Sequence, residues 1–253
     1  MLNLKKITLL KGKKQSLSSF QRENKLCLNS MEYEKTEGIV LRSLPYQDKS
    51  RIVTVFTNCY GVLQFIIKGI SAKRTDKLAL SSPLCQGEYL FYRGKSSLMH
   101  FIDGSVLSEH LQLRTKIQYI QAAANLAQII LASQLPQKPV PKVYQFFYRC
   151  LRAIPYFEDT SVLTNSFCIK LLKQEGLLVL QPLCSRCKNE ARALHHGESF
   201  CSLHAPEFSF RFSQEQWNTL LVLAHATTFS QLQDLISSKD LNEKINQIFQ
   251  ENT

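Results

Sequence analysis

Four potential metal ligands stand in two closely spaced pairs late in the chain. Cys184 and Cys187 form the first pair, and Cys201 and His204 form the second, each with two intervening residues. Thiolate sulfur and imidazole nitrogen are ligands that Zn²⁺ takes in tetrahedral sites, and a two-residue gap lets one tight turn supply both. Because four protein ligands leave no open position for water, the spacing predicts a structural zinc ion rather than a catalytic one.

The connector between the two pairs is polar. It holds 13 residues, including His196, Gly197 and several charged side chains. We therefore expect the segment 184–204 to be an exposed loop that the metal closes. The fourth ligand stays open at this point, since His195 or His196 could replace His204.

The remaining cysteines have no partner at chelating distance in the sequence, so we expect ordinary buried thiols. No secretory signal precedes them, and cytosolic cysteines stay reduced, which disfavours disulfides. They are Cys27, Cys59, Cys85, Cys150 and Cys168.

A catalytic use of the same residues is disfavoured. Zinc deaminases carry an H-x-E motif and a P-C-x-x-C motif. The triplet that begins at His196 matches the first, but it follows the cysteine pair, and Leu183 separates Pro182 from Cys184. The sequence also contains no phosphate-cradling glycine loop, nucleophile elbow or paired-acid motif, so we do not expect an enzyme.

The composition is that of a globular protein with an excess of positive charge. Of the 253 residues, 44% are hydrophobic and 20% are charged, and the formal net charge is +11. Residues 1–30 carry +6, residues 31–110 carry +2, residues 111–180 carry +5, and residues 181–253 carry −2. We expect 1–30 to be a disordered basic leader, or a stretch upstream of a true start at Met31. No apolar stretch approaches the length of a membrane span.

Residues 31–110 have the pattern of a small β domain. Five short segments of alternating or β-branched residues are separated by turn residues at regular spacing, with no long helix between them, which predicts a closed barrel. Phe56, Phe65 and Phe91 occupy positions expected to face the core. The predicted strands are 37–42, 51–57, 62–68, 88–93 and 97–102.

A basic loop is expected between the third and fourth of these strands. It carries Lys68, Lys73, Arg74 and Lys77 against one acid. A solvated charge run is the simpler explanation of such a cluster. Here the cluster adjoins strands rich in Tyr and Phe, and a basic groove with aromatic faces is how small barrels hold single-stranded nucleic acid.

After Leu111 the hydrophobic period becomes helical, which makes the fold class α+β: an N-terminal barrel followed by an all-α domain over 111–253. Helices are predicted over about 114–135, 143–154 and 161–174. The motif Ser213-x-x-Gln216 predicts a capping box that opens a helix to about Ala226, and Asp240-x-x-Glu243 predicts the start of another. On the first helix, one predicted face consists of Ile117, Ile120, Ala124, Ala127 and Leu131.

Several short motifs together resemble the opening of the RecO DNA-repair family. They are Gly38-Ile39-Val40-Leu41, Tyr46, Ser50, Phe56-Thr57, Gly61, Lys68-Gly69 and Lys73-Arg74. That family has an N-terminal oligonucleotide-binding (OB) barrel, a helical domain and, in many members, a four-cysteine zinc module late in the chain. The resemblance covers roughly residues 32–212. It departs at His204, where the family usually has cysteine, and in the short acidic tail 240–253.

The resemblance implies a recombination mediator rather than a catalyst. Such proteins bind single-stranded DNA, with double-stranded DNA as a further candidate, and anneal complementary strands. They act with RecR, and often RecF, and help RecA to replace single-strand-binding protein, whose acidic tail they contact. A bacterial, cytoplasmic, nucleoid-associated protein would follow.

Candidate contacts follow from this reading. For an acidic, apolar-ended peptide on the helical segment they are Lys142, Arg149 and Arg152. Tyr46 and Tyr60 are candidates for base stacking, although both could pack locally. The candidates for DNA contact are Lys68, Lys73, Arg74 and Lys77, followed by Arg42, Lys49 and Arg51.

The main alternative is a zinc-stapled protein-interaction adaptor without intrinsic DNA binding. In that case the barrel would be an interaction module, and oligonucleotides would not bind even at low salt.

Overall fold

The computed structural model of the protein describes residues 32–71 and 75–253. The predicted leader, and with it the question of a start at Met31, lies outside the described residues, as do Lys73 and Arg74. Within the described ranges, no helix has both the length and the apolar character needed to cross a membrane.

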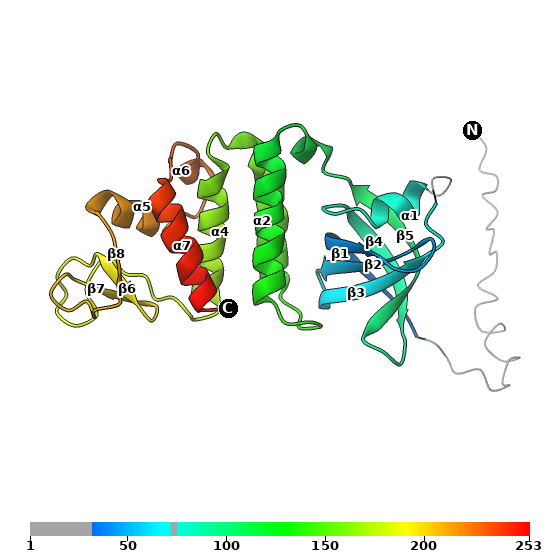
Figure 1. Ribbon diagram of the computed structural model, residues 1–253, viewed down its shortest axis with the longest axis horizontal. Helices are drawn as coiled ribbons and strands as arrows, with labels where there is room; N and C mark the ends of the chain where they lie inside the picture. Colours follow the sequence, from blue (N-terminus) through cyan, green and yellow to red (C-terminus); the bar gives the residue numbers. More distant parts are fainter. Residues whose placement is uncertain (1–31, 72–74) are drawn as a thin grey trace, which may run out of the picture. The chain divides into compact units, whose positions relative to one another are not determined.

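The first part of the described chain is a closed five-stranded barrel (Figure 1). Neighbouring strands follow the order β1-β2-β3-β5-β4, in which β3 and β5 are parallel and the other pairs are antiparallel. This arrangement fits the OB fold and confirms the predicted barrel. The strands are β1 (Tyr33–Pro45), β2 (Ser50–Thr57), β3 (Gly61–Lys68), β4 (Gln86–Arg93) and β5 (Leu98–Ser108).

The barrel interior is filled by alternate residues of each strand, as the period of two requires. Phe65 stacks on Tyr89 with 5.2 Å between ring centroids and meets the edge of Phe91 at the same distance. Phe65 and Phe91 are fully buried there, as predicted. Phe56 is also buried, but on the outside of the barrel, where it packs against Tyr144 of the helical region.

Several predicted boundaries in the barrel were wrong, among them those of β1, which extends beyond the predicted 37–42 at both ends. The expected loop 68–77 contains the start of a short helix, α1 (Thr75–Leu80), so Lys77 lies on a helix and not in a loop. Strand β5 continues to Ser108, because residues after Ile102 still pair with β4 through a bulge.

Five helices of eight residues or more follow in the described chain. The proline at position 141 starts α3, where a missing N–H costs nothing. Short 3-10 helices lie at Leu111–Arg114 and Ile154–Tyr156, and a short α-helix, α6, at Ser230–Gln233. The longer helices are α2 (Ile117–Ser133), α3 (Pro141–Ala153), α4 (Thr160–Gln174), α5 (Gln214–His225) and α7 (Lys239–Glu251).

The predicted face of α2 was wrong. Ile117 is 78% exposed and Ile120 is 43% exposed, whereas of the five predicted residues only Ala127 is fully buried. The helix has no charged residue, so it offers two apolar faces between which periodicity alone cannot choose. The buried face consists of Tyr119, Ala122, Ala123, Leu126, Ala127 and Ile130.

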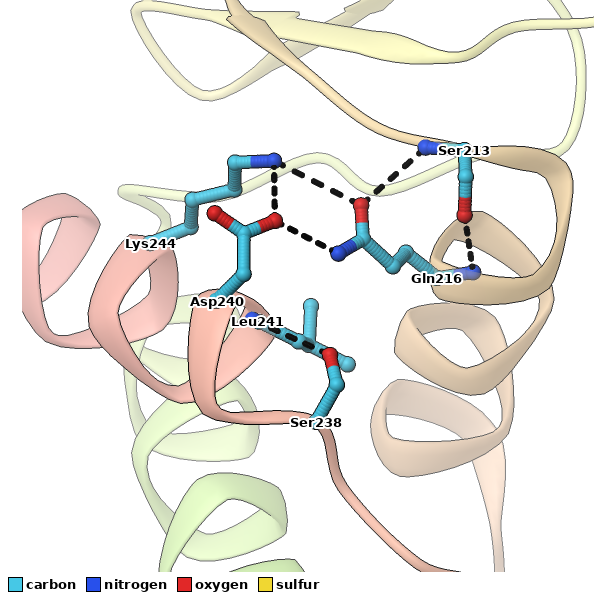
Figure 2. Close-up of polar contacts among 6 residues, drawn as sticks. All are labelled: Ser213, Gln216, Ser238, Asp240, Leu241 and Lys244. Carbon is cyan, nitrogen blue, oxygen red and sulfur yellow. Dashed lines mark hydrogen bonds and ion pairs between the residues drawn. The ribbon is translucent and has the colours of Figure 1, made fainter.

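Helices α5 and α7 begin side by side in one polar network (Figure 2). The capping box at Ser213 and Gln216 is present as predicted. The cap of α7, however, is Ser238, whose hydroxyl accepts a backbone N–H at 3.3 Å, and Asp240 lies inside the first turn. Asp240 instead accepts hydrogen bonds from Gln216 at 2.6 Å and Lys244 at 2.7 Å, which joins the two helix starts.

The barrel packs on the helical region through outward-facing residues of β1, β2 and β3 and through the β2–β3 turn. Ile39, Phe56 and Val62 belong to the helical core although they lie on strands. At the β2–β3 turn, Gly61 has φ +68°, and a Cβ there would lie 2.1 Å from the carbonyl oxygen of Lys138. Only glycine allows this close approach of two backbones.

Residues 184–211, which we call the metal module, lie between α4 and α5. They form a small sheet of β6 (Ala193–His195), β7 (Glu198–Phe200) and β8 (Phe210–Arg211), in the spatial order β7-β6-β8. The predicted exposed loop was therefore wrong, because the connector folds into a β-hairpin that turns at His196 and Gly197. Its apolar strand residues, such as Phe200, are buried.

Candidate metal centre and nucleic-acid interface

The structure brings the four predicted ligands together. Cys184, Cys187, Cys201 and His204 each offer one ligand atom, and these atoms all lie within 4.8 Å of one another. The two pairs come from two turns on either side of the hairpin. His195 and His196 instead lie at the hairpin turn with their rings edge to face, 4.1 Å apart between centroids, so the geometry favours His204 as the fourth candidate ligand.

Backbone hydrogen bonds fix both ligand turns. The N–H of Lys188 donates to the carbonyl of Cys184 at 3.1 Å, and Lys188 takes the left-handed conformation with φ 63°. In the second turn, the N–H groups of His204 and Ala205 both donate to the carbonyl of Cys201, at 3.2 Å and 2.9 Å. Each turn thus aims two side chains at one point.

The donor set and its distances fit a tetrahedral ion. The Sγ atoms of Cys187 and Cys201 are 3.6 Å apart, and His204 Nδ1 lies 3.4 Å from Cys201 Sγ and 3.8 Å from Cys184 Sγ. Zn–S and Zn–N bonds of standard length at tetrahedral angles give separations of roughly 3.8 Å between sulfurs and roughly 3.6 Å between sulfur and nitrogen. A sulfur separation of 3.6 Å is also far too long for a disulfide.

One thiol of the cluster, that of Cys184, differs from the buried thiols of the barrel and the helical core. Burial acts to raise the pKa of Cys184, but hydrogen bonds from three backbone amides and from His204 outweigh it and lower the pKa to about 5. The thiolate is the form that ligates a metal. Burial, with a smaller contribution from the charge of Glu109, raises the pKa of Cys85 to about 11. Burial alone raises the pKa of Cys168 to about 12, as expected of an inert core thiol.

One cysteine prediction was wrong and one stays outside the described residues. Cys85, Cys150 and Cys168 are buried, but Cys59 is exposed because it lies in the β2–β3 turn. Cys27 falls in the part of the chain that the structure does not describe.

Four of the predicted DNA contacts gather at one end of the barrel, which we call the basic end. Ser50 pairs with Lys68 across β2 and β3, and the carbonyl of Lys49 accepts the N–H of Ile70 at 2.8 Å. Helix α1 closes the same end, where Lys77 Nζ donates to the carbonyl of Lys68 at 3.2 Å. The basic end consists of Lys49, Arg51, Lys68 and Lys77.

The cations of the basic end differ in exposure and in the side chains that they contact. Lys49 and Lys68 are exposed, whereas Arg51 donates to Ser81 Oγ at 3.2 Å and Lys77 Nζ lies 5.7 Å from the ring centroid of Phe101. Within the described ranges, none of the four pairs with a carboxylate within 4.0 Å. Positive charge without an internal partner is what a phosphate backbone requires.

The other predicted DNA contacts lie outside the basic end. Arg42 is exposed but lies opposite Thr54, three residue pairs from Arg51, which is roughly 10 Å along the strand. Tyr46 is 38% exposed beyond the β1 end. Tyr60 packs locally, since its ring meets the edge of Phe91 at 5.8 Å and the guanidinium of Arg93 at 5.5 Å.

A second concave surface lies between β5 and α3. This groove has a volume of about 980 Å³ and combines exposed apolar groups with arginines and tyrosines. Arg152 donates to the hydroxyl of Tyr148 at 3.3 Å, and Arg149 lies 5.5 Å from the ring centroid of Phe229. Among the described residues neither arginine pairs with a carboxylate.

Of the three residues proposed for peptide contact, Arg149 and Arg152 line this groove and Lys142 does not. The contribution of Leu107, His110 and Leu111 was missed, because the predicted strand ended too early to place them beside α3. Burial lowers the pKa of His110 and Arg152 lowers it further, while a hydrogen bond to the Leu84 carbonyl opposes both.

Comparisons with known proteins agree with this architecture. The family profile described as Recombination protein O N terminal matches residues 31–109, and that described as Recombination protein O C terminal matches residues 114–251. The chain belongs to the RecO family. The two RecO profiles meet between β5 and α2, where the barrel ends and the helices begin.

RecO proteins of several bacteria are similar over most of their length. The DNA repair protein RecO of Chlamydia pneumoniae is 29% identical over 198 residues, which cover 77% of this chain and 78% of that protein. The protein of the same name from Chlamydia trachomatis serovar L2 is 27% identical over 217 residues, covering 84% and 89%. That of Clostridium perfringens is 24% identical over 196 residues, covering 74% and 78%.

Proposed function

We propose that this RecO-family protein is a DNA repair and recombination mediator that binds single-stranded DNA and anneals complementary strands without chemical catalysis. The observation that carries the proposal is the unpaired positive charge at one end of a closed OB-like barrel. Lys49, Arg51, Lys68 and Lys77 neutralise phosphates, with Arg42 as a peripheral contact. Lys73 and Arg74 remain proposed contacts from the sequence.

Salt dependence tests this site. Binding of an end-labelled single-stranded oligonucleotide is measured by fluorescence anisotropy at several salt concentrations. The combined K49Q, K68Q and K77Q variant should bind more weakly, with the slope of log affinity against log salt reduced by about two units, since each single-strand phosphate contact contributes about 0.7. A matched variant, K116Q, K138Q and K239Q, loses the same charge elsewhere and should retain the slope.

The result also decides between mediator and adaptor. If the intact chain ignores oligonucleotides at low salt, the protein is a protein-interaction adaptor and the mediator proposal fails. If it binds, annealing of complementary strands coated with single-strand-binding protein tests the mediator role. RecR is the proposed partner in that step, RecF a further one, and RecA the recipient of the cleared strand.

The groove between β5 and α3 is the proposed seat for the acidic tail of single-strand-binding protein. Arg149 and Arg152 supply charge for carboxylates, while Leu107, Leu111 and Phe229 supply apolar surface for the end of the tail. The R149Q and R152Q variants should weaken binding to the full-length partner but not to a form lacking its tail. R211Q, on exposed β8, is the control, and equal binding of both partner forms would refute this assignment.

We infer that the metal module holds one structural Zn²⁺ through Cys184, Cys187, Cys201 and His204. Bound there, the ion would supply a cross-link between two turns and no open coordination position. Elemental analysis should give one zinc per chain, and C184S should lose it. A metal-free preparation whose module stays folded would contradict the inference.

A further inference from the structure

A row of aromatic and apolar side chains crosses the outside of the barrel. Strand register places Tyr33 beside Tyr92, Tyr92 beside His100, and His100 beside Ile66. The row continues across β2, because Ile66 pairs with Ile52 and Ile52 pairs with Leu44 at the far end of β1. The outer row thus consists of Tyr33, Tyr92, His100, Ile66, Ile52 and Leu44.

These side chains point away from the barrel interior. Phe91 and Met99 fill the barrel core, so the residues that follow them on β4 and β5 face outward. The helices cover a different row, the one that contains Phe56 and Val62, whereas no member of the outer row belongs to the helical core. Ile66 is buried, but the other members of the outer row are exposed or half-buried, so most of this face is left uncovered by the described helices.

Three rings of the outer row contact one another. Tyr92 stacks on His100 with 4.8 Å between centroids and an interplanar angle of 6°. Tyr33 meets Tyr92 edge-on at 6.4 Å and is 64% exposed. A Cβ at Gly94 would lie 2.7 Å from His100 Nε2, so glycine leaves the space in which this ring lies flat on its neighbour.

Positive charge flanks the outer row on both sides. Lys68 follows Ile66 by two residues on the same face, and Arg42 lies opposite Thr54, two residues from Ile52. Two residues of a strand span about 7 Å, so Lys68 is within reach of a backbone whose bases lie on the rings next to Ile66, whereas Arg42 flanks the aliphatic end of the row.

The acidic groups beside the rings are mostly neutralised. Glu88 pairs with Lys35 at 2.9 Å, and Glu34 pairs with Arg93 at 2.7 Å. Glu37, opposite Glu88, accepts hydrogen bonds from Tyr144 and Gln86, and Asp103, opposite Leu90, lies beyond the stacked pair.

We propose that Tyr33, Tyr92 and His100 form a stacking platform for unpaired nucleobases, while Lys68 holds a flanking phosphate. This inference rests on the proposed function and deepens it, because it assigns the binding of bases to rings beside the basic end, with Lys68 shared between the two. Aromatic rings accept any base on their faces, so the platform selects single strands over duplexes without selecting sequence.

Replacement of the central ring tests the platform. Oligonucleotides of thymidine with one internal 2-aminopurine are used, because the fluorescence of this base is quenched when it stacks on an aromatic ring. Y92L should weaken single-strand binding about 5- to 150-fold, the range expected for one lost base stack, and should abolish the quenching. The salt slope should stay unchanged, since no charge is lost.

Matched variants separate stacking from folding and from phosphate contact. Y92F keeps the ring and should restore both affinity and quenching, whereas F208L removes an 86% exposed ring elsewhere and should change neither. Y92L should leave affinity for a fully paired duplex within about twofold. K68Q should lower the salt slope but preserve the quenching.

The outcomes distinguish this inference from the function on which it rests. If the intact chain binds no oligonucleotide, both fail. If it binds and K68Q lowers the slope, but Y92L binds single strands normally or weakens single strands and duplexes equally, the platform alone is refuted.

Discussion

The helical region and the metal module stabilise themselves in different ways. The helical region buries a large core that includes Trp217, Phe147 and Phe167. The module has a separate cluster of only four buried residues, and two of them, Cys184 and Cys201, are proposed metal ligands. A segment this short cannot bury enough apolar surface to hold its own turns, so the proposed ion takes the place of a core there.

The largest expected effect is loss of the metal. A strong chelator, or C184S, should unfold the module, because binding of structural zinc is coupled to the folding of its site. Cys187 and Cys201 should then react with a thiol reagent, while Trp217, the only tryptophan, should keep its buried emission. Mass spectrometry of the labelled chain and tryptophan fluorescence measure the two regions separately.

One control and one contradicting result complete this test. C59S should leave metal content unchanged, since Cys59 is exposed and far from the cluster in sequence. If chelation shifts the tryptophan emission together with thiol exposure, the module and the helical core unfold as one unit.

A cavity in the helical core should have the opposite effect. Phe147 is fully buried and lies 5.9 Å from Phe56 and 6.2 Å from Phe167, measured between ring centroids. F147A should lower the free energy of unfolding by about 3–5 kcal/mol, yet zinc content should not change. Urea unfolding followed by tryptophan fluorescence gives the first quantity, and F208A, at an exposed ring, should cost less than about 0.5 kcal/mol.

A smaller effect is expected where the barrel contacts the helices. The hydroxyl of buried Tyr144 donates to Glu37 Oε1 at 3.0 Å, and Gln86 donates to the same oxygen at 2.6 Å. Y144F should cost about 1 kcal/mol of unfolding free energy, because the acceptor keeps its second donor. A loss well above about 3 kcal/mol would mean that this bond holds the two regions together.

The smallest predicted effect is a pH dependence from His110. Burial lowers its pKa in the folded state below the ordinary value of 6.5, so the unfolded chain binds the proton first as the pH falls. Stability from this group is complete above about pH 6.5 and decreases below it. Urea unfolding between pH 7.5 and pH 5.5 should show a steeper loss for the intact chain than for H110Q.

Local patterns were sufficient for much of the fold. Alternation predicted the five strands, the two-residue gaps predicted both ligand turns, and the Ser213 box predicted the start of α5. Each of these signals acts between neighbours in sequence. Where two local signals compete, sequence cannot decide: Ser238 and Asp240 both suit a helix start, and only packing against Gln216 shows which one caps.

The surfaces needed contacts between residues far apart in the chain. Lys49 and Lys68 meet because β2 pairs with β3, which the predicted hairpin implied. The groove joins Leu107 to Arg152, and the outer row joins Tyr33 to Tyr92 through pairing of β1 with β4. Barrel closure decides these neighbours, and no periodicity in either segment encodes them.

The bare backbone at Gly61 has a mechanical consequence. Its turn lies against Lys138, and the N–H of Gln137 donates to the carbonyl of Val62 at 3.0 Å, so main chain from the barrel is clamped to main chain from the α2–α3 connector. Any side chain at position 61 would overlap the backbone of Lys138 and push the β2–β3 turn away from the α2–α3 connector. The proposed DNA site on the barrel and the proposed peptide site beside α3 would then lose their fixed spacing, even though every residue of both sites was intact.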